Sequence, residues 1–314
     1  MKTVVTANFC GVGGQSNIMS RATLLVTGAT GFLGSKLVEE FVADGCHVVI
    51  LKRTSSNVWR IGHLLDKLVL IDLENQPFDD IFSQYKFDMV VHCATNYGRR
   101  DVSPIDLINA NLILPLHLLY VADLFGVKAF INTDTFLDKG VNLYSLSKKQ
   151  FLDWLRVYSE KMICANVSLE HFYGPYDDPS KFVTRIVRDL LQGVPEIDLT
   201  LGHQKRDFIF VSDVVHAFKT IIRFVLSGPQ PGMHEFEVGT NQTISVREFV
   251  ETVRSMVGNT NTVLNFGALP YRENEVMDSL VDTSKLRLLR WQPRVSLSEG
   301  LSETILLEKE LIHK

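Results

Sequence analysis

The sequence predicts an α/β fold in which a doubly wound parallel sheet is joined to a smaller, discontinuous C-terminal lobe. Three observations lead to this prediction. Apolar segments of strand length alternate with helical patterns between residues 21 and 169, and such strands are typical of a parallel sheet covered on both faces by helices. A glycine cluster joins the first strand to the first helix. After Leu169 the alternation gives way to turn-rich sequence, which indicates a second lobe.

The strands expected in the sheet succeed one another at short intervals. They are ATLLVT, HVVIL, KLVLI, DMVVHCA, KAFIN and CANVSL, the first of which begins at Ala22. The helix that opens at Gly34 is amphipathic and ends at Gly45. Ser103 and Pro104 supply the N-cap and the first residue of a long helix that ends near Gly126.

The chain is expected to cross between two lobes. Ligands of open α/β sheets bind beyond the carboxyl ends of the strands, so we expect the functional site between the lobes. Residues 1–20 are small, polar and glycine-rich and are expected to form a loose extension. The remaining chain divides into a dinucleotide-binding domain at 21–169 with a returning segment at about 207–240, and a substrate-binding lobe at 170–206 and 241–314.

Composition narrows the possible partners. The chain has 314 residues, 22% of them charged, and a net charge of −4 without a basic block, so we expect neither nucleic acid nor a membrane surface as a partner. No uninterrupted apolar run reaches the roughly 18 residues of a membrane-spanning helix. The 4 cysteines are scattered, without metal-ligand or disulfide spacing. We therefore expect a cytoplasmic protein without a metal site.

The turn after the first strand predicts a dinucleotide site. Glycines at 28, 31 and 34 give a GxxGxxG spacing between a strand and a helix. Gly28 permits the tight turn, Gly31 lets the backbone approach a pyrophosphate, and Gly34 allows close packing of helix and strand. The helix N-terminus then offers N–H groups to the anion, with Thr30, Phe32 and Leu33 also expected at the cofactor. A purely structural turn is the alternative.

The end of the second strand favours NADP(H) over NAD(H). An acidic residue there would bond the ribose 2′-hydroxyl of NAD, but the sequence continues Lys52-Arg53-Thr54-Ser55. A guanidinium and hydroxyls suit a 2′-phosphate, so Arg53 and Ser55 are the expected contacts. A solvated basic loop is the alternative. Asp72, with Leu73 after it, is expected at the adenine, and Ala94 beside the cofactor.

Tyr144 and Lys148 form a candidate proton-transfer pair one helical turn apart. Two residues that merely share a helix face would have the same spacing. Hydride arriving at a carbonyl leaves an alkoxide that needs a proton, and a free tyrosine, with a pKa near ~10, is a weak donor. We expect the charge of Lys148 to lower the Tyr144 pKa. Thr135, after the fifth strand, is expected to donate a hydrogen bond to the substrate oxygen.

Pro115 interrupts the long helix that begins at Pro104. Because proline lacks an N–H, the carbonyl of Asn111 loses its helical partner. We expect this carbonyl to hold a proton-relay water near Lys148 and Asn111 to lie at the cofactor. A helix kink without a catalytic role is the alternative.

The chain contains the motifs TGATGFLG, VVHCAT, YSLSK and RDFIFVSDVV in addition to the Thr135 position. In these features it resembles the extended short-chain dehydrogenases/reductases that modify nucleotide sugars. The resemblance covers about residues 21–308. It implies a Rossmann-like fold, Tyr144 as acid/base with Lys148 as its partner, and a nucleoside-diphosphate sugar in the cleft. It also implies that Arg206 and Arg272 bind the diphosphate. His171 stands where the family more often has asparagine, and Tyr97 is a further candidate substrate contact, with a surface aromatic as the alternative.

The choice of reaction rests on the residues at the end of the fifth strand. Dehydratases of this family carry Thr-Asp-Glu there, and Thr133-Asp134-Thr135 lacks the glutamate. A preference for NADPH favours net reduction. Three segments resemble the CDP-abequose and CDP-paratose synthase group: NTDTFLDK, YSLSKKQF and LTLGHQKRDFIFVSDVV. This resemblance implies reduction of a 4-keto group on a CDP-linked deoxyhexulose for surface polysaccharide (O-antigen) biosynthesis.

Other functions keep the same residues. A nucleotide-sugar 4-epimerase and a reductase of a dTDP- or GDP-linked keto sugar are alternatives, and a non-catalytic NADP-sensing protein is a remote one. A homodimer is the expected assembly.

Overall fold

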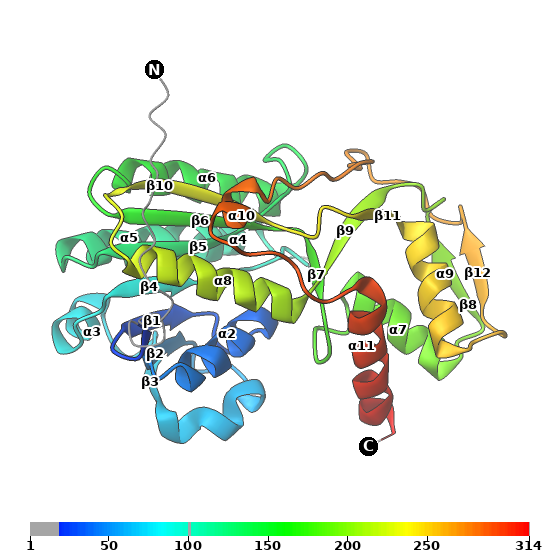
Figure 1. The fold of residues 1–314 in the computed structure, drawn as a ribbon, viewed down its shortest axis with the longest axis horizontal. Coiled ribbons are helices and arrows are strands. Elements are labelled where there is room, and N and C mark those ends of the chain that lie inside the picture. The colour runs from blue at the N-terminus through cyan, green and yellow to red at the C-terminus, as the bar shows by residue number, and fades with distance from the viewer. Residues whose placement is uncertain (1–18, 100–101, 314) are drawn as a thin grey trace.

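The computed structural model describes residues 19–99 and 102–313 (Figure 1). Residues 1–18 of the predicted extension lie outside this part of the chain. Met19, which the extension was expected to include, is buried in the core, and the Cys46 thiol donates a hydrogen bond to its carbonyl. The prediction of a loose segment is therefore wrong for Met19.

Seven parallel strands form the main sheet in the described part of the chain, in the order β10-β6-β5-β4-β1-β2-β3. All six predicted strands are confirmed, and the seventh comes from the returning segment. The fifth continues beyond its prediction to Thr135. The bounds are β1 Thr23–Thr27, β2 His47–Lys52, β3 Leu68–Asp72, β4 Met89–His92, β5 Ala129–Thr135, β6 Ile163–Leu169 and β10 Gly232–Val238.

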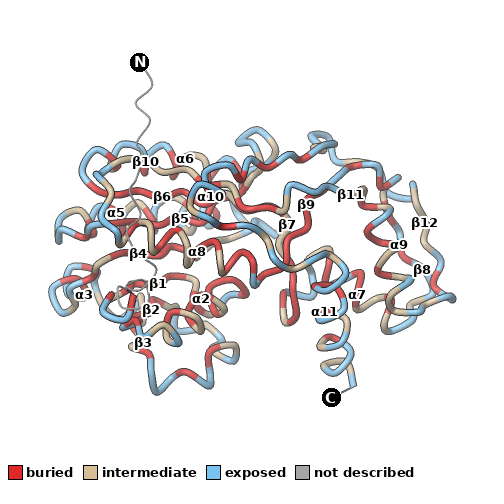
Figure 2. Tube along the Cα trace, in the orientation of Figure 1, coloured by how far each residue is buried: buried red, intermediate tan, exposed pale blue. Residues whose placement is uncertain are grey.

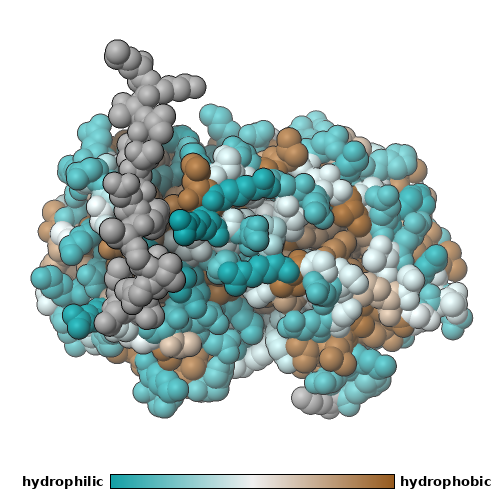
Figure 3. Space-filling model, viewed as in Figure 1, coloured by the Kyte–Doolittle hydropathy of each residue, from teal (hydrophilic) through white to brown (hydrophobic). Residues whose placement is uncertain are grey.

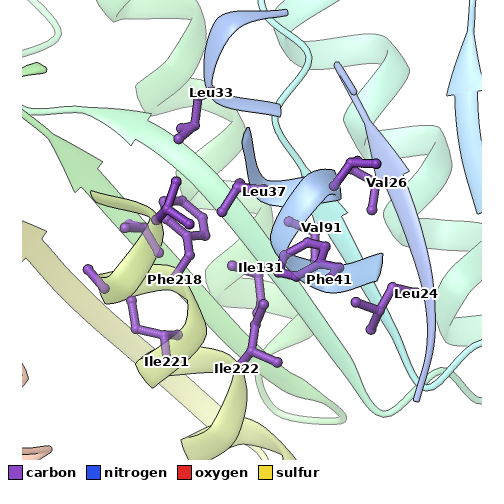
Figure 4. Close-up of a cluster of buried hydrophobic side chains, with 14 of the residues drawn as sticks. Leu24, Val26, Leu33, Leu37, Phe41, Val91, Ile131, Phe218, Ile221 and Ile222 are labelled. Atoms are coloured by element: carbon purple, nitrogen blue, oxygen red, sulfur yellow. The ribbon is translucent and has the colours of Figure 1, made fainter. Parts of the chain in front are cut away.

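Helices cover both faces of this sheet, as predicted for a doubly wound fold. On one face α2 (Phe32–Ala43) and α8 (Val211–Leu226) press apolar side chains onto the strands, and Figure 4 shows this cluster. The other face carries α3 (Phe78–Gln84), the long helix and α6 (Leu143–Tyr158). The strands are the most continuously buried segments in Figure 2. The shorter helices nearby are η1 (Trp59–Lys67) and α10 (Ser284–Leu288).

The long helix has three parts. Ser103 caps its start, as predicted, by accepting a hydrogen bond from the Asp106 N–H. The parts are α4 (Pro104–Ile108), a π-helical turn η2 (Asn109–Ile113) and α5 (Leu114–Leu124). By length and composition alone this is the one helix of the described residues that would cross a membrane. It packs against α6 within the sheet domain, and a core helix passes the same test.

The second lobe has its own core around two small sheets (Figure 1). Phe208 stacks on Phe249 with ring centroids 4.0 Å apart. Hydrophilic side chains spread over both lobes on the face seen in Figure 3, with apolar ones in separate patches. The elements are β7 (His171–Tyr173), α7 (Phe182–Gln192), β8 (Glu196–Leu199), β9 (Lys205–Phe210), β11 (Thr243–Ser245), α9 (Val246–Val257), β12 (Val263–Phe266) and α11 (Leu297–Ile312).

Candidate active site

A cleft of about 1040 Å³ lies between the lobes. Its floor is made by residues at the carboxyl ends of β1, β4, β5 and β6, where the strand order of an open α/β sheet places a ligand. The start of α7 and the ends of β8 and β9 supply the opposite wall. All three predicted catalytic residues line this cleft.

The glycine turn at the end of β1 fits a dinucleotide. Gly28 has φ +70°, and a Cβ there would lie 2.5 Å from the Ala94 nitrogen. A Cβ on Gly34 would overlap the Gly28 carbonyl, so β1 and α2 pack closely because both residues are glycine. α2 begins at Phe32 without a side-chain cap on its first N–H groups. Exposed N–H groups at a helix start bind anions such as a pyrophosphate.

The β2 end presents cations to the same cleft. Lys52 and Arg53 line it, together with Ser56, whose hydroxyl accepts a hydrogen bond from the Arg53 N–H at 3.2 Å. Among the described residues, the cleft lining includes Ser56 but not Ser55, and the phosphate contact of Ser55 stays a prediction. Lys52 is the last residue of β2, and Thr54 and Ser55 form a turn after it.

Asp72, the predicted adenine contact, interacts with the end of β2 and with the loop after it. Its carboxylate accepts a hydrogen bond from Thr54 at 2.7 Å and lies 3.6 Å from the Lys52 ammonium. The Thr54 hydrogen bond is the main reason why the Asp72 pKa is below its ordinary value. Asp72 is absent from the cleft lining of the described residues, whereas Leu73 belongs to it. Asp72 therefore braces the loop that carries Arg53.

Tyr144, Thr135 and Lys148 meet where β5 ends and α6 begins. Asn142 caps α6 through a capping box with Ser145, which fixes the first turn and so the direction of Tyr144. The Thr95 and Thr135 side chains act on the Tyr144 phenol by lowering its pKa. Lys148 is 1% exposed, and its ammonium has no hydrogen-bond acceptor among the described residues. A buried, unpaired cation beside the glycine turn fits a polar cofactor.

Burial controls the acidity of this group. It raises the pKa of Tyr144, with further contributions in the same direction from Tyr97 and Asp134, while the hydrogen bonds from Thr95 and Thr135 act in the opposite direction. The expected lowering by Lys148 is wrong for this structure. Burial also lowers the pKa of Lys148 itself, because the interior disfavours the charged form of either group. Burial thus keeps the phenol protonated and makes it a weaker acid.

The Asn111 side chain joins two segments of the chain, and the carbonyl relay stays a prediction. The π-helical turn before Pro115 is the kink that the proline predicts. Asn111 is fully buried; its amide nitrogen donates to the Ser147 hydroxyl at 3.0 Å, and its amide oxygen accepts from the Asn96 N–H at 2.8 Å. Asn111 therefore joins α6 to the loop after β4. Neighbouring Ala110 and Leu114 reach the cleft.

The predicted substrate residues also line the cleft. Arg206 already binds the carbonyls of Lys205 and Val276, at 2.7 and 2.6 Å, and forms a short ion pair with Glu275. Arg272 is exposed at the rim.

His171 is oriented by its neighbour Glu170. The His171 Nδ1 lies 3.0 Å from the buried Glu170 carboxylate, which also binds the Ser279 hydroxyl. This contact turns the other ring nitrogen away from Glu170, so His171 presents one oriented nitrogen.

Lys181 is a cleft residue that sequence reasoning missed. Its ammonium lies 4.7 Å from the ring centroid of Phe172 and 5.2 Å from that of Tyr97, and 3.3 Å from the Asp177 carboxylate. Tyr97 in turn lies 5.3 Å from the Tyr144 ring. Thr95 was missed as well. Its position three residues after His92, beyond the end of β4, was the available signal.

The chain is similar to proteins that act on nucleotide sugars. A model described as the NAD dependent epimerase/dehydratase family matches residues 24–239. A CDP-abequose synthase of Salmonella muenchen is 30% identical, over 91% of this chain and 98% of that protein. A UDP-glucose 4-epimerase of Mycolicibacterium smegmatis is 29% identical, over 90% of this chain and 96% of that protein.

Solved structures share the fold. The UDP-glucose 4-epimerase of Thermotoga maritima, in a structure with UDP-glucose, has a TM-score of 0.79 at 24% identity and covers 92% of this chain and 99% of that one. An epimerase of Methanothermobacter thermautotrophicus has a TM-score of 0.82 at 20% identity and covers 96% of this chain and 97% of that one. The predicted Rossmann-like architecture is confirmed.

Proposed function

The chain belongs to the NAD dependent epimerase/dehydratase family, and we propose that within this family it is an NADPH-dependent 4-ketoreductase. It is an NAD(P)-dependent oxidoreductase of the extended short-chain type that modifies nucleotide sugars. The proposed substrate is a CDP-linked deoxyhexulose, reduced in the cytoplasm for surface polysaccharide. The similarity to the Salmonella CDP-abequose synthase over nearly the full length of both chains supports this choice.

One observation carries the proposal: a phenol and a threonine hydroxyl line the cleft at the end of β5, and the Asp134 carboxylate beside them is held in an ion pair. Tyr144 and Thr135 both line the cleft, and Thr135 lowers the pKa of the Tyr144 phenol. Asp134, the residue between Thr133 and Thr135, is tied to Lys149 at 2.8 Å and its side chain has no exposed surface. A dehydratase needs an acid and a base to remove water, and this Asp134 carboxylate is engaged elsewhere.

The protein's part in the reaction is to deliver a proton. NADPH, when bound, supplies the hydride. Tyr144 Oη donates its proton to the oxygen of the former ketone, which would otherwise carry negative charge, and the Thr135 hydroxyl donates a hydrogen bond to the same oxygen. Lys148 lies one turn along α6, and we assign to its charge the task of favouring the phenolate against the larger, opposite effect of burial. Thr95 steadies the phenol from the β4 side.

The cofactor choice rests on the β2 end. Lys52, Arg53 and Ser56 line the cleft. We propose that their side chains bind the 2′-phosphate of NADPH. A guanidinium binds phosphate through two parallel hydrogen bonds. Asp72 is already occupied by Thr54 and Lys52, so it does not repel a 2′-phosphate as an unpaired carboxylate would.

A nucleotide-sugar 4-epimerase is the second candidate, supported by the Mycolicibacterium relative. NADPH absorbance separates the two. A reductase consumes one NADPH for each sugar converted, whereas an epimerase converts sugar with no net change in absorbance. Binding of NADP without any turnover would instead support a sensing protein.

The nucleotide base is tested by thermal shift. With NADP present, CDP-, UDP-, dTDP- and GDP-sugars are compared, because a ligand that binds the folded state raises the melting temperature by mass action. We expect the CDP-sugar to give the largest shift. A larger shift with the dTDP- or GDP-sugar would move the proposal to that substrate, and a flat response would count against a sugar nucleotide.

A homodimer is proposed through the long helix and α6. These helices pack side by side and expose large apolar side chains on their outer faces, among them Ile105 (64%), Leu124 (58%) and Val157 (62%). A patch of this kind on two adjacent helices marks an interface. Light scattering should give a dimer that Leu124→Glu dissociates, while Leu288→Glu, at an exposed site on α10, leaves it intact. A monomeric wild type would refute the proposal.

A further inference from the structure

An ion pair lies directly behind the catalytic tyrosine and takes no part in the proposed proton transfer. Asp134, the next-to-last residue of β5, faces Lys149, the residue after Lys148 on α6. Their charged atoms are 2.8 Å apart. The Asp134 side chain is completely enclosed, while that of Lys149 is 20% exposed. A buried carboxylate needs such partners, because an unpaired charge in the interior is costly.

The pair holds Thr135 from both sides. The Thr135 N–H donates to Asp134 Oδ1 at 2.7 Å, and the Lys149 ammonium donates to the Thr135 carbonyl, also at 2.7 Å. Thr135 therefore has its backbone fixed by the two residues of the pair, and its side chain lowers the pKa of Tyr144. Since Lys149 and Tyr144 lie on the same helix, the pair sets the spacing between the β5 end and the first turns of α6.

Strand β6 completes the anchor. The Asn166 amide donates to Asp134 Oδ2 at 3.0 Å, and the Asn132 amide donates to Asn166 at 2.7 Å. Asn166 is 2% exposed. Asp134 thus accepts hydrogen bonds from Thr135, Lys149 and Asn166, and its position is determined by β5, β6 and α6 together. Removing Lys149 leaves the carboxylate in place but without its counter-charge.

Asp134 faces both proton-transfer residues, and Lys149 faces Lys148. Asp134 raises the pKa of Tyr144 and that of Lys148, and Lys149 lowers the pKa of Lys148. The other ionisable groups that face them come from β4 and the loop after it: Tyr97 raises the Tyr144 pKa, Cys93 raises the Lys148 pKa, and His92 faces Lys148. Asp134 is the carboxylate among these groups, and Lys149 is its counter-ion.

We propose that Asp134 and Lys149 are positioning residues for the reduction: as a neutral pair they hold Thr135 against Tyr144, and each screens the other's charge from the catalytic phenol. The proposal rests on the proposed function, in which Tyr144 donates the proton. It goes beyond that function by assigning a task to two residues that touch neither the substrate oxygen nor the hydride.

The test is the pH profile of kcat for a charge-deletion cycle. Tyr144 must be protonated to donate, so the rate falls as pH rises through its pKa. Asp134→Asn leaves Lys149 uncompensated and should move this basic limb to lower pH by roughly one unit. Lys149→Met leaves Asp134 uncompensated and should move the limb to higher pH. The double variant removes both charges and should return the limb close to its wild-type position.

Controls separate charge from packing. Lys149→Arg keeps the cation and should keep the limb in place. Arg156→Met removes the cation of an exposed ion pair on the same helix, 2.7 Å from Glu235, and should leave the profile unchanged. If the three variants of the cycle lower kcat without moving the limb, or if the two single variants move it in the same direction, the proposal is overturned.

A second readout needs no sugar. Ultraviolet difference titration of tyrosinate, each variant against the same variant carrying Tyr144→Phe, orders the Tyr144 pKa directly. The onset should come at lower pH in Asp134→Asn than in Lys149→Met. If the protein reduces none of the sugars offered, this order still holds and the proposed function alone fails. An identical onset in both variants would overturn the pair's role even in an active reductase. Should Asp134→Asn fail to fold, Lys149→Met and Lys149→Arg against wild type decide the question.

Discussion

Replacing Tyr144 by phenylalanine removes the proposed proton donor and little else. The phenylalanine ring keeps its place against Tyr97, 5.3 Å away. The hydroxyl on which Thr95 and Thr135 act is lost. Thr135 remains bonded, because its hydroxyl also accepts from the Leu137 N–H at 3.2 Å. The cofactor turn at Gly28 is untouched, so binding of NADPH should be unchanged.

The size of the effect depends on the task assigned to the hydroxyl. General acid catalysis contributes about 10²–10⁴-fold, so we expect kcat to fall by that factor, which corresponds to roughly 3–5 kcal/mol of transition-state stabilisation. The fold should lose much less. Each hydrogen bond contributes about 0.5–1.5 kcal/mol net, and a buried phenyl ring offsets part of that. The free energy of unfolding should therefore fall by at most about 2 kcal/mol.

The assay is single-turnover oxidation of NADPH with the keto-sugar nucleotide at saturation, next to urea unfolding of the same samples. Tyr120→Phe is the matched control, because Tyr120 lies on α5 with 49% of its surface exposed and away from the cleft lining. It should retain full activity. A Tyr144→Phe enzyme within about threefold of wild type, with intact NADPH binding, would refute the role of the phenol as general acid.

Other parts of the structure lead to three further predictions. Arg53→Ala should weaken NADPH binding about 10- to 100-fold in calorimetric titrations, because one or two charge-assisted hydrogen bonds are lost. NADH binding should be unchanged. Equal losses of affinity for both cofactors would contradict the 2′-phosphate site. Arg188→Met should lower the free energy of unfolding by about 2–4 kcal/mol, measured by urea unfolding. It removes the cation that lies 2.6 Å from the Glu308 carboxylate, whose side chain has no exposed surface. Adding Glu308→Gln to this variant should restore part of the lost stability. Burial holds the His92 pKa well below its ordinary value, so below about pH 6.5 the unfolded chain binds a proton at His92 that the folded chain does not bind. The free energy of unfolding should therefore decrease as pH falls below that value, by up to about 1.4 kcal/mol per pH unit. His92→Asn should reduce this dependence on pH.

The sheet was predictable because its strands are apolar on both faces, and helices cover both sides. The exception is the end of β5. Asn132 to Thr135 is a polar stretch that does not resemble a buried strand, yet all of it is buried. Its side chains are satisfied by partners far along the chain: Thr133 donates to the His92 carbonyl at 2.9 Å, and Asp134 pairs with Lys149. A pattern of hydrophobicity contains no record of such pairings.

The candidate site divides in the same way. The glycine turn and the Tyr144–Lys148 spacing depend on residues within one or two helical turns, so the sequence displays them directly. Lys181 and Asn111 depend on contacts between segments, such as Lys181 with Tyr97 and Asn111 with Ser147. The acidity of Tyr144 was predicted with the wrong sign, because the spacing shows the neighbouring amine while the burial that dominates the pKa arises from the whole fold.

The most direct test of the proposed reaction traces one deuterium atom. NADPH deuterated at the transferable position is incubated with the enzyme and a CDP-linked 4-keto deoxyhexulose, and the product is examined by NMR and mass spectrometry. A ketoreductase gives one oxidised NADPH per sugar and deuterium at C4 of the product. Conversion of the sugar without net NADPH oxidation, and without deuterium at C4, would contradict it.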